Sequence, residues 1–138
     1  MWSSASESSR EALGLLQRRV ALFGLASGGL GLIFLVFRAV VHVADRDFDE
    51  LRDPSFLYHL LGVALALSAW LACRSGSRPR GVIRAAEMVA LLGPGVAYQL
   101  MGWHVSLGER PELTVLLALT YSVTARSAYV PSTARRTP

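Results

Sequence analysis

The chain has 138 residues, of which 52% are hydrophobic and only 17% are charged, against roughly 25% charged in an ordinary soluble domain. The mean hydropathy is +0.39. No lysine is present, which excludes a P-loop lysine, a Schiff-base lysine and a kinase phosphate-pairing lysine, and the single cysteine, Cys73, excludes an internal disulfide. The composition predicts a membrane protein without nucleotide chemistry of its own, and we expect no cofactor, no metal and no enzyme activity.

The first 19 residues precede the first apolar block and are predicted as a cytoplasmic leader and juxtamembrane helix. Ser8 and Glu11 have the spacing of a capping box, which predicts a helix start at Ser8. The serine-rich stretch 3–9 is expected to be disordered. The apolar block that follows starts too late and is too long for a cleaved signal peptide, so we expect it to be retained.

Four apolar segments are long enough to cross a membrane. A helix needs about 20 mainly apolar residues to cross a hydrocarbon core of roughly 30 Å. Helices satisfy their own backbone in lipid, and short loops make neighbouring spans antiparallel. The predicted fold is therefore all-α, an integral membrane four-helix up-down bundle over residues 20–130, with residues 131–138 as a short cytoplasmic tail. The predicted spans are 20–43, 55–73, 85–105 and 113–130.

The loop charges predict the orientation. All fourteen basic residues are arginines. Four of them fall on the same side of the predicted membrane as most of the acidic residues, namely Arg38, Arg46, Arg52 and Arg110. The other ten lie on the opposite side. By the positive-inside rule both termini face the cytoplasm. The absence of lysine and asparagine and the scarcity of isoleucine suggest a GC-rich bacterial genome, so the predicted location is a bacterial inner membrane.

The first span carries small residues that suit close helix packing. Gly24 and Gly28 form a GxxxG pattern, and Gly31 follows one turn later. This spacing is typical of a dimerisation face. Packing against another span of the same chain is the alternative interpretation.

The third span contains Gly93, Pro94 and Gly95 near its centre. Proline frees the carbonyl of Ala90, and the flanking glycines soften the helix, which predicts a hinge. A static, packed kink is the alternative. Glu87, the acidic residue inside this span, is expected to pair with Arg84 three residues earlier.

Three histidines are candidates for a ligand-binding or pH-sensing site. His42, His59 and His104 all fall at the acidic side of the predicted topology. Imidazoles at a membrane surface bind transition metals or report pH. No two have the spacing of a helical metal site, so the alternative is three unrelated interfacial histidines.

The arginines on the cytoplasmic side are predicted to contact anionic lipid headgroups. Nucleic acid is not expected as a partner, because this surface is small and faces lipid. The predicted lipid contacts are Arg18, Arg19, Arg74, Arg78, Arg80, Arg84, Arg135 and Arg136.

Several stretches resemble one protein family. They are Arg18-Arg-Val-Ala-Leu-Phe-Gly24, Arg84-Ala-Ala-Glu87, Leu116-Leu-Ala-Leu-Thr-Tyr121, Ala125-Arg126 and Val130-Pro-Ser-Thr-Ala-Arg-Arg-Thr137. Together they resemble the membrane-spanning region of multi-pass bacterial, especially myxobacterial, serine/threonine protein kinases. The resemblance implies a membrane module joined to a cytoplasmic kinase domain. No kinase catalytic residue is present, so we expect either a truncated reading frame or a stand-alone module.

The predicted function is a non-catalytic sensor or anchor module in the lipid bilayer, acting with a homo-oligomer or with a partner membrane or kinase protein. The alternative is a small oligomeric transporter or channel subunit. A membrane enzyme is a third hypothesis, which requires a metal held by the three histidines.

Overall fold

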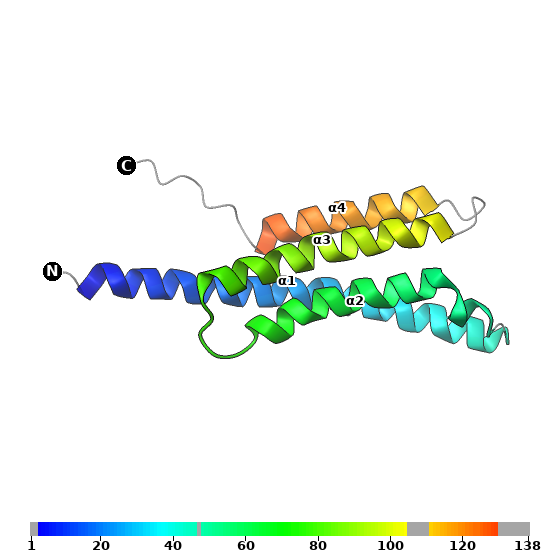
Figure 1. The fold of residues 1–138 in the computed structure, drawn as a ribbon, viewed down its shortest axis with the longest axis horizontal. Helices are drawn as coiled ribbons and strands as arrows, with labels where there is room; N and C mark the ends of the chain where they lie inside the picture. Colours follow the sequence, from blue (N-terminus) through cyan, green and yellow to red (C-terminus); the bar gives the residue numbers. More distant parts are fainter. Residues whose placement is uncertain (1–2, 47, 105–110, 130–138) are drawn as a thin grey trace.

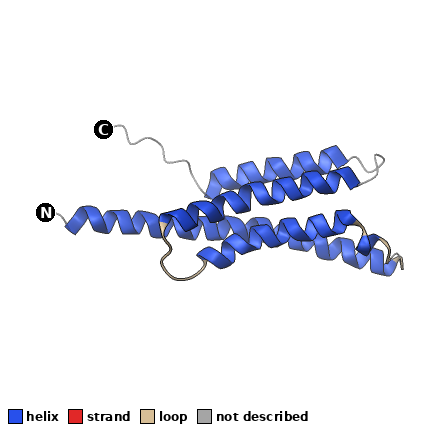
Figure 2. Ribbon diagram, viewed as in Figure 1, coloured by secondary structure: helices blue, strands red, loops and turns tan. Residues whose placement is uncertain are grey.

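The computed structural model describes residues 3–46, 48–104 and 111–129, and within these ranges the protein is all-helical (Figures 1 and 2). The predicted all-α class is confirmed, and no strand occurs in the described ranges. The elements are α1 (Ser3–Ala44), the short 3-10 helix η1 (Glu50–Arg52), α2 (Pro54–Cys73), α3 (Arg80–His104) and α4 (Pro111–Tyr129).

Consecutive helices run in opposite directions and lie side by side (Figure 1). α2 packs against both α1 and α3, α4 packs against α3, and α1 also contacts α3 and α4. We call the end that carries loop 74–79 and the start of α3 the basic end, and the end that carries η1 and the start of α2 the acidic end. The amino-terminal part of α1 projects beyond the other helices at the basic end.

Three of the described helices are long and apolar enough to cross a membrane: α1 from Arg10, α2 and α3. α4 is not among them. Only 39%, 33% and 28% of the most apolar windows of these three helices is buried inside the molecule, so most of their apolar surface faces outward. The 42 residues of α1 give a length of about 63 Å at about 1.5 Å per residue, roughly twice the hydrocarbon thickness of a bilayer.

Two helix starts differ from the prediction. α1 starts at Ser3, so the capping box at Ser8 does not begin the helix, and stretch 3–9 is helical rather than disordered. Extending an existing helix adds one hydrogen bond per residue without a new nucleation step, which accounts for the continuation. α3 starts at Arg80, because the carbonyl of Pro79 accepts hydrogen bonds from Val82 and Ile83.

The tightest packing lies at the basic end, where all four helices meet. Val20, Phe23 and Ile83 are fully buried there. Small residues from the neighbouring helices surround them and allow the backbones to approach closely. The other buried members of this core are Ala21, Ala69, Cys73, Ala86, Ala90 and Ala125.

Candidate functional site

The three predicted histidines all lie toward the acidic end, but the structure does not bring them together as metal ligands. His42 is on the last turn of α1, His59 is buried in α2, and His104 is exposed at the end of α3. Among the residues that the structure describes, no group of three or more histidine, cysteine, aspartate or glutamate side chains is placed to hold a metal ion. Each histidine therefore has its own surroundings.

His59 joins three helices at one point inside the molecule. Its Nε2 lies 3.1 Å from the carbonyl oxygen of Gly31 on α1, and its ring meets Tyr98 on α3 edge-on, with centroids 5.5 Å apart. A side chain at Gly31 would collide with the Tyr98 hydroxyl, since its Cβ would lie 2.9 Å away. The glycine thus makes room for a buried polar contact between α1, α2 and α3.

A second set of polar contacts lies nearer the acidic surface. Arg38 on α1 donates to the Ser55 hydroxyl across 2.7 Å and lies over the ring of Phe56, 5.9 Å from its centroid. Asp53 caps α2 by accepting from the Ser55 backbone N–H at 2.7 Å. Hydrogen bonding from Ser55 lowers the pKa of Asp53 below its usual range, and the nearby positive charge of Arg38 lowers it further.

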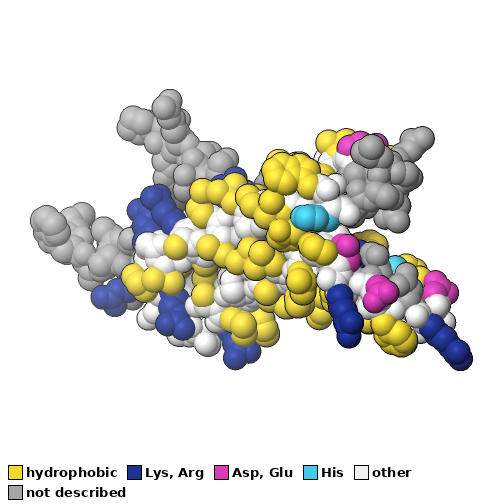
Figure 3. Space-filling view, turned by 45° about the vertical axis from the view of Figure 1, so that its right-hand side comes forward, with side chains coloured by type: hydrophobic (Ala, Val, Ile, Leu, Met, Phe, Trp, Pro, Cys, Tyr) yellow, Lys and Arg dark blue, Asp and Glu magenta, His cyan; other side chains and the backbone are white. Residues whose placement is uncertain are grey.

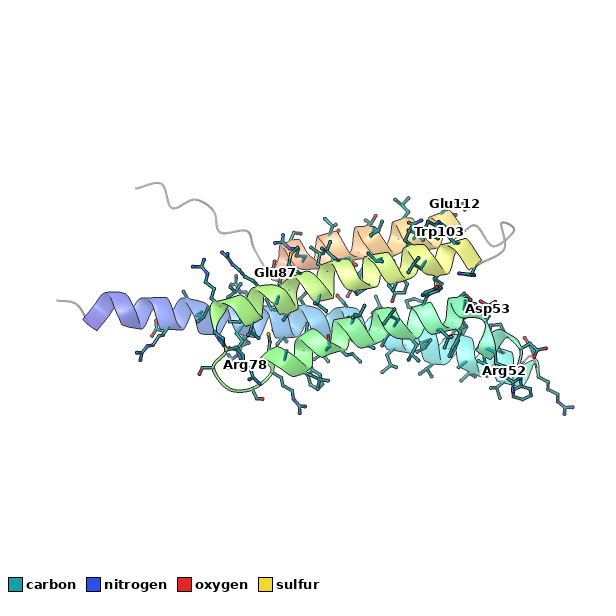
Figure 4. All side chains as sticks on the ribbon, viewed as in Figure 1. Arg52, Asp53, Arg78, Glu87, Trp103 and Glu112 are labelled. Atoms are coloured by element: carbon teal, nitrogen blue, oxygen red, sulfur yellow. The ribbon has the colours of Figure 1, made fainter. Side chains whose placement is uncertain are left out.

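His104 closes this region on the side of α3. Its ring stacks on Tyr58 of α2, with centroids 5.4 Å apart and an angle of 27° between the planes. We call Arg38, Asp53, Ser55, His59 and His104, with the tyrosines 58 and 98, the acidic-end cluster. Its position in Figure 4 is marked by Asp53 and by Trp103, the residue before His104. The cluster fixes the relative positions of α1, α2 and α3 at one end of the molecule.

The glycines of α1 face α2 within the same chain. A Cβ at Gly24 would lie 2.8 Å from the Ala66 carbonyl oxygen and 2.9 Å from the Trp70 backbone nitrogen, and one at Gly28 would lie 2.6 Å from the Leu67 side chain. Gly31 faces Val63 as well as Tyr98. The GxxxG face is therefore occupied by α2, which corresponds to the intramolecular interpretation of this pattern.

The Gly93-Pro94-Gly95 segment lies inside an unbroken α3. A Cβ at Gly93 would lie 2.9 Å from Leu65 of α2, and one at Gly95 would lie 3.2 Å from Leu119 of α4. Pro94 itself is buried. The two glycines thus let α3 pack closely against α2 on one side and α4 on the other. This packing explains both glycines without a hinge, as in the alternative interpretation of a static, packed segment.

At the basic end, Gln17 of α1 holds the loop between α2 and α3. Its side-chain amide donates to the carbonyls of Cys73 at 2.9 Å and Gly76 at 2.6 Å, and its carbonyl accepts from the Arg78 backbone N–H at 3.0 Å. We call this arrangement the Gln17 junction. It fastens the basic end of α1 to the rest of the molecule.

Glu87 pairs with α4 rather than with its predicted partner. Arg126 donates to its Oε1 from two nitrogens, at 2.7 and 3.0 Å, and the Glu87 side chain is 12% exposed. The expected pair with Arg84 is wrong. Sequence spacing identifies only neighbours on the same helix, whereas the partner of Glu87 lies on α4. The interaction links α3 and α4.

The predicted lipid-contact arginines lie around the basic end. Figure 3 shows most of the basic side chains at that end, with a broad hydrophobic surface between the two ends. The acidic side chains lie mainly at the other end, where further basic side chains stand beside them. Arg74 lies over the ring of Trp70, 5.0 Å from its centroid. Arg18, Arg19, Arg74, Arg78, Arg80 and Arg84 are exposed, and Arg135 and Arg136 lie outside the described residues.

Comparison with known proteins gives no relative. No protein family, no curated protein and no solved structure matches the chain. Function is therefore argued from the contacts above. Sequence reasoning missed Ser55, Tyr58, Tyr98 and Gln17, since a polar residue in an apolar segment becomes notable only when its partner on another helix is known.

Proposed function

We propose that this chain is an integral membrane protein, a four-helix up-down bundle in a bacterial inner membrane with both termini cytoplasmic, and that it acts as a non-catalytic sensor or anchor module. Changes at the acidic-end cluster alter the packing of α1 against α2 and α3. The projecting part of α1 carries that change to a cytoplasmic partner. A protein kinase is the partner that the family resemblance implies.

The observation that carries the proposal is the continuity of α1. This helix runs without a break from Ser3 to Ala44 and takes part in the acidic-end cluster through Arg38 and in the Gln17 junction at the basic end. These two residues are 21 positions apart, about 32 Å along the axis. A rigid helix held at two ends transmits a small shift or rotation, which is a known mode of switching.

The Gln17 junction holds α1 in place, so a shift of α1 relative to α2 requires its hydrogen bonds to break. Three hydrogen bonds hold one side chain of α1 to the α2–α3 loop. If α1 shifts relative to α2, these bonds break together. The region before Gln17 then changes its position relative to loop 74–79, and a partner bound there can detect the difference.

A distance measurement tests this coupling. Spin labels are placed on exposed positions by Ala12→Cys and Ser77→Cys, and the protein is studied in lipid nanodiscs; the native Cys73 is 2% exposed and stays unlabelled. We expect Arg38→Gln, which removes the bond to Ser55, to add a second distance between the labels. Gln17→Leu should broaden the distribution in the same region.

Arg52→Gln is the matched control, because it removes the same charge from the acidic end at an exposed residue in η1. Its distance distribution should equal that of the parent. If Arg38→Gln also leaves the distribution unchanged, the two ends are not coupled and the sensor proposal fails. Solute or ion flux through liposomes that contain the purified protein would instead support the transporter or channel hypothesis.

A further inference from the structure

An apolar groove runs between α2 and α3 on the surface of the molecule. Its volume is about 440 Å³, and it is lined by apolar residues, among them Leu65, Met88, Leu92, Gly93 and Val96. At Gly93 the two helices approach closely, since a Cβ there would lie 2.9 Å from Leu65. It is open to the surroundings along the helices, where lipid tails lie if α2 and α3 cross the bilayer.

The groove has the length of one acyl chain in one leaflet. It extends along α3 from Met88 to Leu100, which corresponds to about 18 Å of helix. Half of a hydrocarbon core is about 15 Å. A chain lying in the groove therefore reaches from near the basic end to the middle of the membrane.

Two arginines stand at the mouth of this groove. Arg84 precedes Met88 by one helical turn on the same face of α3, and side chains on a helix tilt toward its amino end, which for α3 is the basic end. On the other side, Arg78 donates from Nε to the carbonyl of Ala72 at 3.0 Å. Ala72 lies two turns beyond Leu65 on α2, and Figure 4 places Arg78 in the loop that joins the two helices.

The neighbouring charges leave this mouth positive. Oε1 of Glu87, the closest acidic residue along α3, is taken by Arg126 of α4. Arg84 is exposed and makes no ion pair with any residue that the structure describes. A positive mouth over an apolar groove matches the two parts of one ligand, an anionic headgroup and an acyl chain.

We propose that the α2–α3 groove binds one anionic phospholipid, with its acyl chain along Leu65, Met88 and Val96 and its phosphate between Arg78 and Arg84. This inference rests on the membrane placement in the proposed function and adds a defined lipid site to it. The site would fix the α2–α3 loop, which Gln17 also holds, so lipid composition would act on the same junction.

The test is native mass spectrometry of the full chain in detergent, titrated with dioleoyl phosphatidylglycerol or with dioleoyl phosphatidylcholine. We expect one phosphatidylglycerol per chain, bound more tightly than phosphatidylcholine. Each of Arg78→Gln and Arg84→Gln should weaken phosphatidylglycerol about fivefold, since one basic residue contributes about 1 kcal/mol near an anionic surface, and should leave phosphatidylcholine unchanged. Val96→Trp, which fills the groove, should weaken both lipids.

Two controls match these variants. Arg10→Gln removes an exposed arginine from the projecting start of α1, and Leu117→Trp adds the same ring to the exposed face of α4; neither should change binding. If Arg10→Gln weakens phosphatidylglycerol as much as Arg78→Gln or Arg84→Gln does, or if Val96→Trp causes no loss, the proposed site is overturned. Competition by inorganic phosphate alone would show an anion site without a lipid. The lipid titration in detergent and the spin-label distances in nanodiscs are independent measurements. A failure of the lipid site therefore does not decide the sensor proposal.

Discussion

Single glycines determine how closely α1 and α2 pack. At Gly24 the neighbouring atoms belong to the backbone of α2, which cannot turn aside as a flexible side chain can. At Gly29, on the same helix, nothing lies within 4 Å of an added Cβ. The two positions therefore form a matched pair in which the same substitution has opposite consequences.

We predict that Gly24→Ala lowers the free energy of unfolding by about 1–3 kcal/mol, the range for an overfilled interface. Gly29→Ala should be neutral or should raise it by up to about 1 kcal/mol, because alanine favours the helix. Thermal or SDS unfolding of the detergent-solubilised protein gives both values, and cross-linking gives the oligomeric state. A loss of dimer without loss of monomer stability in Gly24→Ala would instead support the dimerisation interpretation.

Among the elements, α4 is the helix that by its composition would need help from a neighbour to cross a membrane. It is not among the helices that are apolar enough to span by composition, and it carries Arg126 in its last turn. The contact with Glu87 neutralises both charges and anchors α4 to α3. We infer that α4 crosses the bilayer as a hairpin with α3 rather than on its own.

Replacing Arg126 should lower the free energy of unfolding more than replacing Arg84. Arg126→Gln leaves the Glu87 carboxylate without its partner in a poorly exposed place, and we predict a loss of about 1–3 kcal/mol in the free energy of unfolding. Arg84→Gln, which removes an exposed arginine without an ion pair among the described residues, should change it by less than about 0.5 kcal/mol. The exchange Glu87→Arg with Arg126→Glu should recover part of the loss. Equal effects of the two single substitutions would show that the α3–α4 pair contributes nothing.

At the scale of the whole molecule, charge is divided between the two ends. Most of the basic side chains lie at the end where α1 begins, whereas the other end carries the acidic loop together with a few basic side chains (Figure 3). The apolar surface between them is broad, as a lipid-solvated protein requires. This division predicts which end faces the cytoplasm.

Cysteine labelling tests that orientation and the fourth crossing together. The native Cys73 is buried beside the Gln17 junction, so it provides an unlabelled background. A membrane-impermeant thiol reagent should label Ser77→Cys and Ser127→Cys in inverted vesicles and Arg52→Cys in intact spheroplasts. Labelling of Ser127→Cys from the same side as Arg52→Cys would show that α4 does not cross, and a complete exchange of sides would reverse the orientation.

The helical class, the approximate helix positions and the separation of charge could all be predicted from the amino-acid sequence. In lipid, single apolar segments of this length can satisfy their backbone hydrogen bonds only as helices. The net charge of a loop follows from its residues alone, whichever residues it contacts. These properties are local, so they can be predicted without knowing which helices touch. The glycine spacing likewise indicated a close helix contact, although it did not identify the partner.

The contacts between residues of different helices could not be predicted and are known from the three-dimensional structure alone. It gave Glu87 a partner on α4 rather than Arg84, placed α2 against the α1 glycines, and brought His59 to Gly31 while His104 stacks on Tyr58. Such contacts depend on the rotation and registry of each helix about its axis. Those are set by side-chain packing over the whole bundle, and no periodicity within one segment specifies them.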